Sequence, residues 1–420
     1  MKISQTRVPD IVRMILRRLK GAGFAAYIVG GAVRDMVMGR KPTDWDVATS
    51  AAASDLGDLF PRLKQFSLQH GTVTLVHEGE HYEVSAFRGP SPTIGDDLAH
   101  RDFTINAMAW EPDDEMLIDP WGGSRDLALR IVRSVGAPED RFREDPLRLL
   151  RAARLCCELG FRIHRKTRES MSGMAPMLAT VAKERVRDEL MGILASEKPS
   201  LGFRTMVRAN LVKEVLPELH NTIGPIMEAM DRMAPDPVLR LAALFHDIAE
   251  PGAKEAPEVE SARIAEAAMR RLRFSERLIS QVTHLVRHHR DAINYHPSWD
   301  EGAVRRLVRK VGAEQLELFF FLCRGCLESQ GKDARLLSDL EDRVKTNLKT
   351  GFPRKLQDLR VDGRKVMEIC GINGGPEVGR VLEALLEEVL DHPEWNTEEK
   401  LVERLKEMRL RSGIYQPVLP

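Results

Sequence analysis

The sequence predicts an α/β domain at the N-terminus followed by a series of all-helical domains. Short segments rich in β-branched residues and bounded by glycine or proline are typical of strands, and they lie within the first 137 residues. These segments are residues 25–33, 71–79, 81–89 and 116–123. From residue 138 onward apolar residues recur mostly at intervals of three and four, which favours helices. Glycine and proline interrupt this pattern at residues 196–200, 233–237, 250–258, 294–298 and 371–377.

Length and composition limit the classes of protein to consider. A chain of 420 residues is long enough for two to four domains. Lysine plus arginine and aspartate plus glutamate both total 63, so a nucleic-acid-binding surface would have to be a local patch. The N-terminus lacks the apolar core of a signal peptide, and no later apolar run approaches about 18 residues. We therefore expect a cytoplasmic protein that does not bind a membrane.

The cysteine pattern predicts buried thiols. The only CxxC motif of the chain is formed by Cys323 and Cys326. No second pair completes a zinc site of the usual four ligands. Because the motif follows Phe319, Phe320 and Phe321, we expect both thiols to lie in an apolar core.

Two glycines and two aspartates near the first predicted strand indicate a site for a nucleotide and its metal ion. Gly30 and Gly31 end the apolar run and precede a helical segment that contains Arg34, which would let a phosphate approach the backbone. In a strand, Asp44 and Asp46 would share one face. Two converging carboxylates are satisfied by a hard divalent cation, typically Mg²⁺. The alternatives are an ordinary glycine turn and a solvated strand edge.

A third carboxylate would complete a two-metal site, and Glu83 in the strand at residues 81–89 is the candidate. In such a site one ion activates an attacking hydroxyl and the other holds the triphosphate and the leaving pyrophosphate. The alternative for Glu83 is an exposed strand glutamate. An RNA-binding protein without catalytic activity would require this acidic set to be broken, and it is intact.

Several motifs of the chain together resemble those of a known enzyme family. They follow one another over the first half of the chain as VGGAVRDMVMGRKPTDWDVATSA, HGTVTLV, DLAHRDFTINAMAW, IDPWGGSRDL, RFREDPLRLLRAARL and VAKERVRDEL. In this order they resemble the class II tRNA nucleotidyltransferases (CCA-adding enzymes) and bacterial poly(A) polymerases. Members of this family add nucleotides to RNA 3′ ends without a nucleic-acid template and depend on magnesium.

The resemblance implies an α/β polymerase-β-like nucleotidyltransferase head followed by all-helical neck, body and tail domains. On this basis we assign residues 1–137 to the catalytic head and 138–198 to a neck that selects the base. Residues 199–335 would form an HD-like body, and 336–420 a tail that binds the tRNA elbow. The implied partners are the 3′ end, acceptor stem and elbow of tRNA, with CTP and ATP as nucleotides.

Residue roles also follow from the resemblance. Asp44 and Asp46 take the positions of the metal ligands, with Glu83 as the third carboxylate. Gly30, Gly31 and Arg34 take the triphosphate-binding turn. Contacts to ribose and phosphate are implied for Arg101, Asp102 and Asn106. His100 stands where an arginine is usual, which puts one triphosphate contact in doubt.

Asp145 and Arg148 are the candidates for base selection. Three residues apart, they could face one ligand, and a carboxylate acceptor beside a guanidinium donor matches cytosine and adenine but not uracil or guanine. The alternative is that Asp145 caps a helix and Arg148 pairs with Glu144. By resemblance Arg185 would help to hold the base, unless it only pairs with Glu189. Arg151 and Arg154 are expected to contact the nucleotide or the tRNA backbone.

The segment between Arg88 and Arg101 is short. Family members that complete the CCA end usually carry a longer flexible, basic loop there. The short segment therefore favours a CC-adding enzyme, with full CCA addition next and a separate A-adding enzyme as the implied partner. Poly(A) synthesis comes third because the chain lacks a long basic C-terminal extension.

A second activity is indicated in the body. The pair His246 and Asp247, with His288 and His289 further on, resembles HD-type phosphohydrolases that bind divalent transition metals. His220 is the candidate for an earlier ligand, and Asp291 or Asp333 for a later one. The alternative is an HD fold that serves only as a scaffold for RNA binding.

Overall fold

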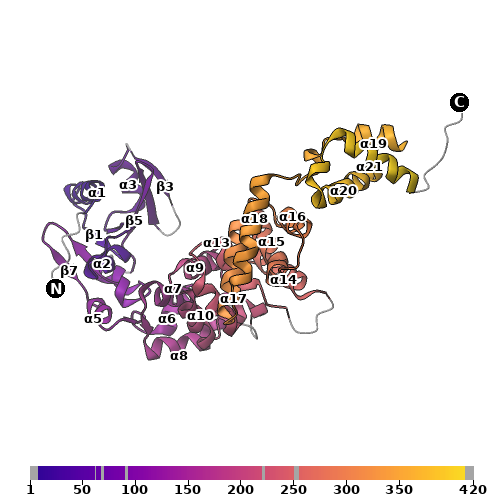
Figure 1. Cartoon of the computed structure of the whole chain (residues 1–420). Helices are drawn as coiled ribbons and strands as arrows, with labels where there is room; N and C mark the ends of the chain where they lie inside the picture. Colours follow the sequence, from indigo (N-terminus) through magenta and orange to yellow (C-terminus); the bar gives the residue numbers. More distant parts are fainter. Residues whose placement is uncertain are drawn as a thin grey trace. The chain divides into compact units, whose positions relative to one another are not determined.

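A computed structural model describes residues 8–61, 63–67, 71–89, 93–219, 223–249 and 255–411. The chain forms two compact units, residues 1–220 and 221–420. The first unit contains the sheets and the helices α1 to α11, and the described part of the second unit is helical (Figure 1). The prediction of an α/β head followed by helical regions is therefore confirmed.

A mixed sheet of seven strands forms the head, in the order β3-β4-β5-β2-β1-β6-β7. Only β2 and β5 are parallel, and the other pairs are antiparallel. The strands are β1 Ala26–Val29, β2 Asp46–Thr49, β3 Lys64–Ser67, β4 Thr72–His77, β5 Glu80–Ala86, β6 Ala109–Glu111 and β7 Met116–Ile118. The four predicted segments contain β1, β4, β5 and β7, whereas β3 and β6 were not predicted.

The head helices connect these strands. They are α1 Asp10–Gly21, α2 Gly31–Val37, α3 Ala53–Leu59, α4 Ile94–Ala99 and α5 Gly123–Ala128. The central strands β1 and β2 pack around a small apolar cluster that includes Val29, Ala48, Leu98 and Ala109. Because α2 starts directly after β1, the glycine turn between them lies at the edge of this core.

The rest of the first unit is a helical region joined to the head by a small parallel sheet. Its strands are β8 Ile131–Val132 and β9 Arg162–Ile163. Its helices are α6 Pro138–Glu144, α7 Arg148–Leu159, α8 Arg165–Met174, α9 Lys183–Ala195, α10 Pro199–Arg208 and α11 Val212–Val215. Helix α7 packs against both α9 and α10. Helices α10 and α11, assigned above to the body, thus belong to the first unit, and the division into four domains stays a prediction.

The second unit contains the helices α12 to α21. They are α12 Ile223–Arg232, α13 Pro237–Phe245, α14 Pro257–Arg271, α15 Glu276–Ile293, α16 Glu301–Val311, α17 Leu316–Ser329, α18 Arg335–Thr350, α19 Gly363–Cys370, α20 Pro376–Asp391 and α21 Glu398–Arg411. Short 3₁₀ helices of the chain cover Thr104–Asn106, Ala175–Thr180, Pro217–Leu219, Leu356–Asp358 and Pro393–Trp395. Helices α19 to α21 share an apolar core that includes Val366, Leu385 and Leu405.

Cys323 and Cys326 confirm the prediction of core thiols. Both are fully buried in α17 and neither forms a disulfide. Burial raises the pKa of the Cys326 thiol to about 12, so the thiol stays protonated. Within the described ranges, no helix is both long enough and apolar enough to span a bilayer.

Candidate active site

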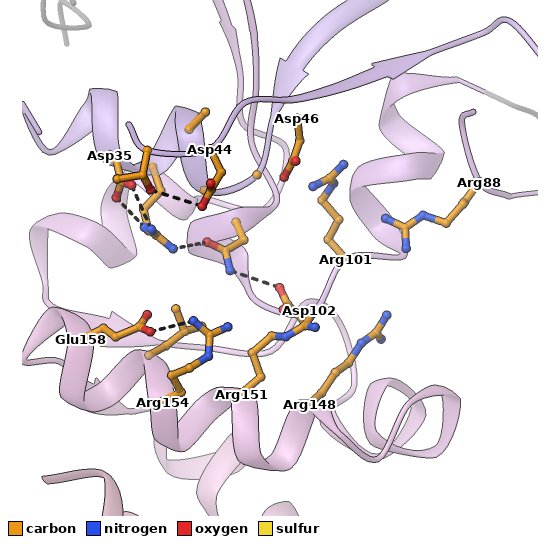
Figure 2. A pocket seen from close by; sticks show the side chains of 17 residues that line it. Asp35, Asp44, Asp46, Arg88, Arg101, Asp102, Arg148, Arg151, Arg154 and Glu158 are labelled. Carbon is orange, nitrogen blue, oxygen red and sulfur yellow. Dashed lines mark hydrogen bonds and ion pairs between the residues drawn. The ribbon is translucent and has the colours of Figure 1, made fainter. Parts of the chain in front are cut away.

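A cavity of about 470 Å³ lies in the first unit, between the head and helix α7. Figure 2 shows the aspartates of the head on one side of this space and the arginines of α7 on the other. The lining residues are Gly30, Gly31, Ala32, Arg34, Asp35, Thr43, Asp44, Asp46, Arg88, Arg101, Asp102, Asn106, Arg148, Arg151, Arg154, Leu155 and Glu158. Most of the predicted site residues are thus brought together, whereas Glu83, Asp145 and Arg185 do not line the cavity.

The turn at Gly30 requires glycine for two reasons. Its φ of 73° lies in the region that side chains other than glycine rarely adopt. A Cβ atom at this position would lie 3.0 Å from Nη1 of Arg101 and 3.3 Å from Oδ2 of Asp46. Because Gly30 has no side chain, the space between the backbone and the charged groups of Arg101 and Asp46 stays open.

Asp46 is the first residue of β2, and Asp44 precedes the strand instead of lying in it. The expected alternation still holds, because both aspartates line the cavity while Trp45 between them is buried. Asp46 lies opposite Glu83 in the parallel pairing of β2 with β5. Burial, together with the charges of Glu83 and Asp44, raises the pKa of Asp46 to about 6, and the charge of Arg101 opposes this rise.

These carboxylates fit the chemistry of a hard divalent cation. Like charges that are crowded and partly buried favour either protonation or a bound cation, and the raised pKa of Asp46 reports this crowding. Among the described residues, no three histidine, cysteine, aspartate or glutamate side chains are grouped closely enough to hold a metal ion. Asp44 and Asp46 are therefore the proposed protein ligands at this position, and the role of Glu83 as a third ligand stays a prediction.

Arg101 is held in place by a buried aspartate that was not predicted. Oδ2 of Asp97 accepts hydrogen bonds from Nε and Nη2 of Arg101, both at 3.1 Å. Oδ1 of Asp97 accepts a hydrogen bond from Nε of Arg88 at 3.0 Å. Burial would raise the pKa of Asp97, but the two guanidinium groups outweigh burial and lower it. Asp97 thus orients two of the arginines that line the cavity.

A chain of hydrogen bonds links the triphosphate-binding candidates to α7. Arg34 donates to Asp35 at 2.9 Å and to Oδ1 of Asn106 at 3.1 Å. Asn106 donates to Asp102 at 3.4 Å. The other carboxylate oxygen of Asp102 accepts a hydrogen bond from Arg151 at 3.2 Å. Burial opposes the charge of Asp102, yet Arg151 and the backbone N–H of Phe103 keep its pKa below the ordinary value.

Helix α7 presents charged side chains to the cavity at helical spacing. Arg148, Arg151, Arg154 and Glu158 are three or four residues apart, so they share one face of the helix (Figure 2). Buried Glu189 of α9 accepts hydrogen bonds from Nε of Arg151 at 3.3 Å and from Nε of Arg154 at 2.7 Å. One carboxylate thereby holds two of the guanidinium groups that line the cavity.

The base-selection candidates Asp145, Arg148 and Arg185 are bonded to other groups of the protein. Arg148 donates to Glu144 at 2.8 Å and to the carbonyl oxygen of His100 at 2.9 Å. Asp145 lies before α7, because the helix starts only at Arg148. The Asp145 carboxylate accepts a hydrogen bond from Arg185 at 2.9 Å. The Glu144 alternative for Arg148 is thus observed, and Arg185 pairs with Asp145 instead of Glu189.

The HD-type ligands of the second unit are held apart by other partners. Buried His246 packs edge-on against His289, with 5.5 Å between ring centroids, and not against His288. His288 forms a hydrogen bond with Asp291 at 3.1 Å. Asp247 accepts a hydrogen bond from Arg290 at 2.9 Å, and Asp333 accepts one from Arg335. His220 lies outside the described residues. The expected set of metal ligands is not assembled within the described part of the chain, and these contacts favour the scaffold alternative.

Several functional candidates were missed by the sequence analysis. They are Asp35, Arg88, Asp97, Glu158 and Glu189. The four-residue spacing of Asp97 and Arg101, and of Arg154 and Glu158, could have revealed two of these ion pairs. The role of Glu189 depends on how α9 packs on α7, which local spacing does not show.

Comparison with known proteins places three family models along the chain. A "Poly A polymerase head domain" matches residues 26–133. A "Probable RNA and SrmB- binding site of polymerase A" matches residues 160–223. A "tRNA nucleotidyltransferase domain 2 putative" matches residues 260–405. The three matches follow one another in order and together cover most of the sequence.

Curated relatives match about half of the chain. A CCA-adding enzyme of Bacillus velezensis is 41% identical over 229 residues, which cover 51% of this chain and 57% of the relative. A CC-adding tRNA nucleotidyltransferase of Halalkalibacterium halodurans is 47% identical over 189 residues, which cover 45% of this chain and 49% of the relative. The chain thus matches about half the length of these relatives. 

A solved structure matches over nearly the full length. The structure of a Bacillus stearothermophilus CCA-adding enzyme in complex with CTP aligns with a TM-score of 0.77 and 28% identity. The alignment covers 96% of this chain and 98% of the other. The agreement of the folds therefore extends beyond the region of clear sequence similarity.

Proposed function

Because the chain belongs to the family of tRNA nucleotidyltransferases and poly(A) polymerases, we propose that it adds CMP to the 3′ end of tRNA without a template. The observation that carries this proposal is the single cavity with Asp44 and Asp46 on one wall and three arginines of α7 on the other. A nucleoside triphosphate carries both a metal-binding polyphosphate and a base, so it can use both walls. CTP is the first substrate, and ATP is the second candidate.

The residues of the cavity have separable roles in this reaction. Gly30 leaves open the space beside Asp46 and Arg101, and Arg34 and Arg101 supply positive charge to the triphosphate. Asp44 and Asp46 would hold Mg²⁺, which supplies charge neutralisation at the transferred phosphoryl group and lowers the pKa of the attacking 3′ hydroxyl. The protein itself contributes positioning and preorganised charge.

Arg151, Arg154 and Arg148 are preorganised before any ligand binds. Glu189 fixes the first two, and Glu144 with the carbonyl oxygen of His100 fixes the third. Gly192 of α9 contributes by leaving space, since a Cβ atom there would lie 2.3 Å from Cδ of Arg154. Because the arginine side chains are already held in place, they lose less conformational entropy when the nucleotide binds.

Base selection is proposed for Asp145 with Arg185, which form an ion pair beside the start of α7. A carboxylate acceptor and a guanidinium donor match the amino group and ring nitrogen of cytosine or adenine. Uracil and guanine present the opposite pattern, and mismatching such groups costs a few kcal/mol, roughly. The pairing seen here would have to open toward the incoming base.

We favour two additions over three because the segment from Arg88 to Arg101 is short and internally bonded. Arg88 binds Asp97 within this segment, and residues Ile94–Ala99 are helical as α4. The described residues 93–101 are thus held by the helix and by the ion pair, which limits how far they could reshape the cavity for adenine. The curated relatives include both CC-adding and CCA-adding enzymes, so their names leave the number of additions open.

The experiment uses tRNA transcripts that end at the discriminator base, incubated with Mg²⁺ and with CTP, ATP or both. Products are resolved at single-nucleotide length, with Asp44→Ala as the inactive control. Two additions that stop even when ATP is present support the CC-adding proposal. A third, ATP-dependent addition shows full CCA synthesis, and long products with ATP alone show poly(A) synthesis. No extension with any nucleotide overturns the proposed function.

A further inference from the structure

A second cavity of the first unit, of about 410 Å³, is distinct from the site described above. It is lined by β9, α8 and α10, and helix α7 separates the two cavities, because Leu155 lines the first and Cys156 lines the second. Its floor is apolar and includes Ile131, Phe161 and Leu201. Its remaining lining is strongly basic.

Five arginines surround this floor, and none of the residues that line the second cavity is acidic. The arginines are Arg162, Arg165, Arg168, Arg204 and Arg208. Acidic and basic residues are equal in number over the whole chain, so this excess of positive charge is local. A concentration of this kind produces a local positive field that attracts a polyanion.

Four of these arginines have no carboxylate partner among the described residues, unlike the arginines of the first cavity. Arg165 bonds Glu169 at 2.9 Å, whereas the described structure gives no side-chain ion pair to the other four. In the first cavity, by contrast, the arginines of α7 and Arg34 are each bonded to a carboxylate. Guanidinium groups that converge without a counter-charge repel one another, and a phosphate group relieves this repulsion by bidentate hydrogen bonding.

The arrangement of the arginines suits an extended anion. Arg204 and Arg208 lie one turn apart on α10, and Arg165 and Arg168 one turn apart on α8. The hydroxyl of Ser172 in α8 donates to the carbonyl oxygen of Arg208 at 3.3 Å, which fixes the two helices side by side. Two rows of cations above an apolar floor fit a sugar-phosphate backbone, with ribose over the floor and phosphates on the rows.

We infer that this cavity binds the phosphodiester backbone of the tRNA substrate away from its 3′ end, through Arg162, Arg168, Arg204 and Arg208. This inference depends on the proposed function for the identity of the RNA. It assigns an affinity role to residues that do not touch the reacting nucleotide. The RNA-binding family model matches residues 160–223 without naming single residues, whereas we assign the contact to four side chains of this cavity.

The test is the salt dependence of binding of a tRNA transcript without its CCA end, measured without nucleotide. In Arg204→Ala/Arg208→Ala we expect affinity about ten-fold weaker, and a slope of log affinity against log salt that is shallower by about two, one per phosphate contact. The matched control is Arg263→Ala/Arg270→Ala, which removes two exposed arginines of α14 that pair with glutamates. This control should keep the wild-type affinity and slope.

Two further measurements keep the inference separate from the proposed function. At saturating tRNA the Arg204/Arg208 variant should retain the wild-type kcat for CMP addition, because both residues are exposed and neither lines the first cavity. Wild-type protein that binds tRNA but adds no nucleotide would overturn only the proposed activity. A variant that binds tRNA with unchanged affinity and slope, or loses affinity for CTP instead, would overturn the inference.

Discussion

Asp46 and Glu83 lie directly opposite each other on the parallel strands β2 and β5. Burial and the negative charges of Glu83 and Asp44 together raise the pKa of Asp46 to about 6, and the positive charge of Arg101 opposes this rise. Desolvation makes the largest contribution to this rise. The arrangement costs free energy in the protein alone, which is expected where a site is built for a cation.

Asp46→Asn should therefore stabilise the protein in the absence of divalent cations. Between the ordinary pKa of 3.8 and the folded value of about 6, the folded state binds more protons than the unfolded state. The free energy of unfolding then falls as pH rises through this window, and above it the ionised carboxylate is a net cost. We expect a gain on the order of 1–3 kcal/mol at neutral pH that disappears toward pH 4, roughly.

Thermal denaturation at a series of pH values, with a chelator present, measures this effect. CMP addition by Asp46→Asn should fall by a factor of at least about 10³ if Asp46 is a ligand of the metal ion as proposed. Added Mg²⁺ should raise the Tm of the wild type but not that of the variant. A variant less stable than the wild type at neutral pH would show that Asp46 is held by contacts and not strained by charge.

Gly30→Ala should lose activity by displacing Arg101. The positive φ costs about 1–2 kcal/mol of stability for a residue with a side chain, and the new Cβ would approach Nη1 of Arg101 at 3.0 Å. The matched control is Gly23→Ala, since Gly23 also has a positive φ, of 88°, but has no atom within 4 Å of its Cβ position. Both variants should lose similar stability, and only Gly30→Ala should raise the KM for CTP and lower kcat. Equal loss of activity in both would assign the effect to backbone strain.

Glu189→Gln tests whether α9 positions the arginines of α7. The amide can still accept a hydrogen bond from Arg151 or Arg154, but it no longer neutralises them. We expect kcat/KM for CTP to fall about 10- to 100-fold, equivalent to roughly 1.4–2.7 kcal/mol. The control is Glu169→Gln, which changes an exposed ion pair with Arg165 that lies outside the first cavity. Unchanged kinetics in Glu189→Gln would mean that the arginines orient themselves without this partner.

The sequence predicted the chemistry of the cavity better than its geometry. Gly30, Arg34, Asp44 and Asp46 could be recognised because they lie close together in the chain and their types suit a metal-bound phosphate. Their placement opposite α7 depends on the packing of two regions of the first unit. Local spacing carries no information about such packing, so Glu189 was missed although its neighbour Arg185 was found.

Two local patterns admitted two interpretations each, and the observed contacts are those of the alternatives. Arg148 lines the cavity and bonds Glu144, and its expected contact with a base shared with Asp145 stays a prediction. The HD motif suggested a metal site, but burial pairs His246 with His289 and leaves His288 to Asp291. Glu144 and Asp291 had both been named from the sequence, but only the packing of the helices shows which contact each of them makes.

Asp145→Ala tests base selection directly. The Asp145 carboxylate accepts a hydrogen bond from Arg185, and both groups remain partly accessible, with 24% and 51% of their side chains exposed. Removing the carboxylate removes the acceptor for the amino group of cytosine, so the preference for CTP over UTP in kcat/KM should fall about 10- to 100-fold. Asp140→Ala, which breaks an exposed pairing with Arg143 in α6, should keep the preference. Because the two residues are proposed to act together, Asp145→Ala/Arg185→Ala should be little worse than either single variant. Additive losses, or an unchanged preference in an active Asp145→Ala, would show that the base is read elsewhere.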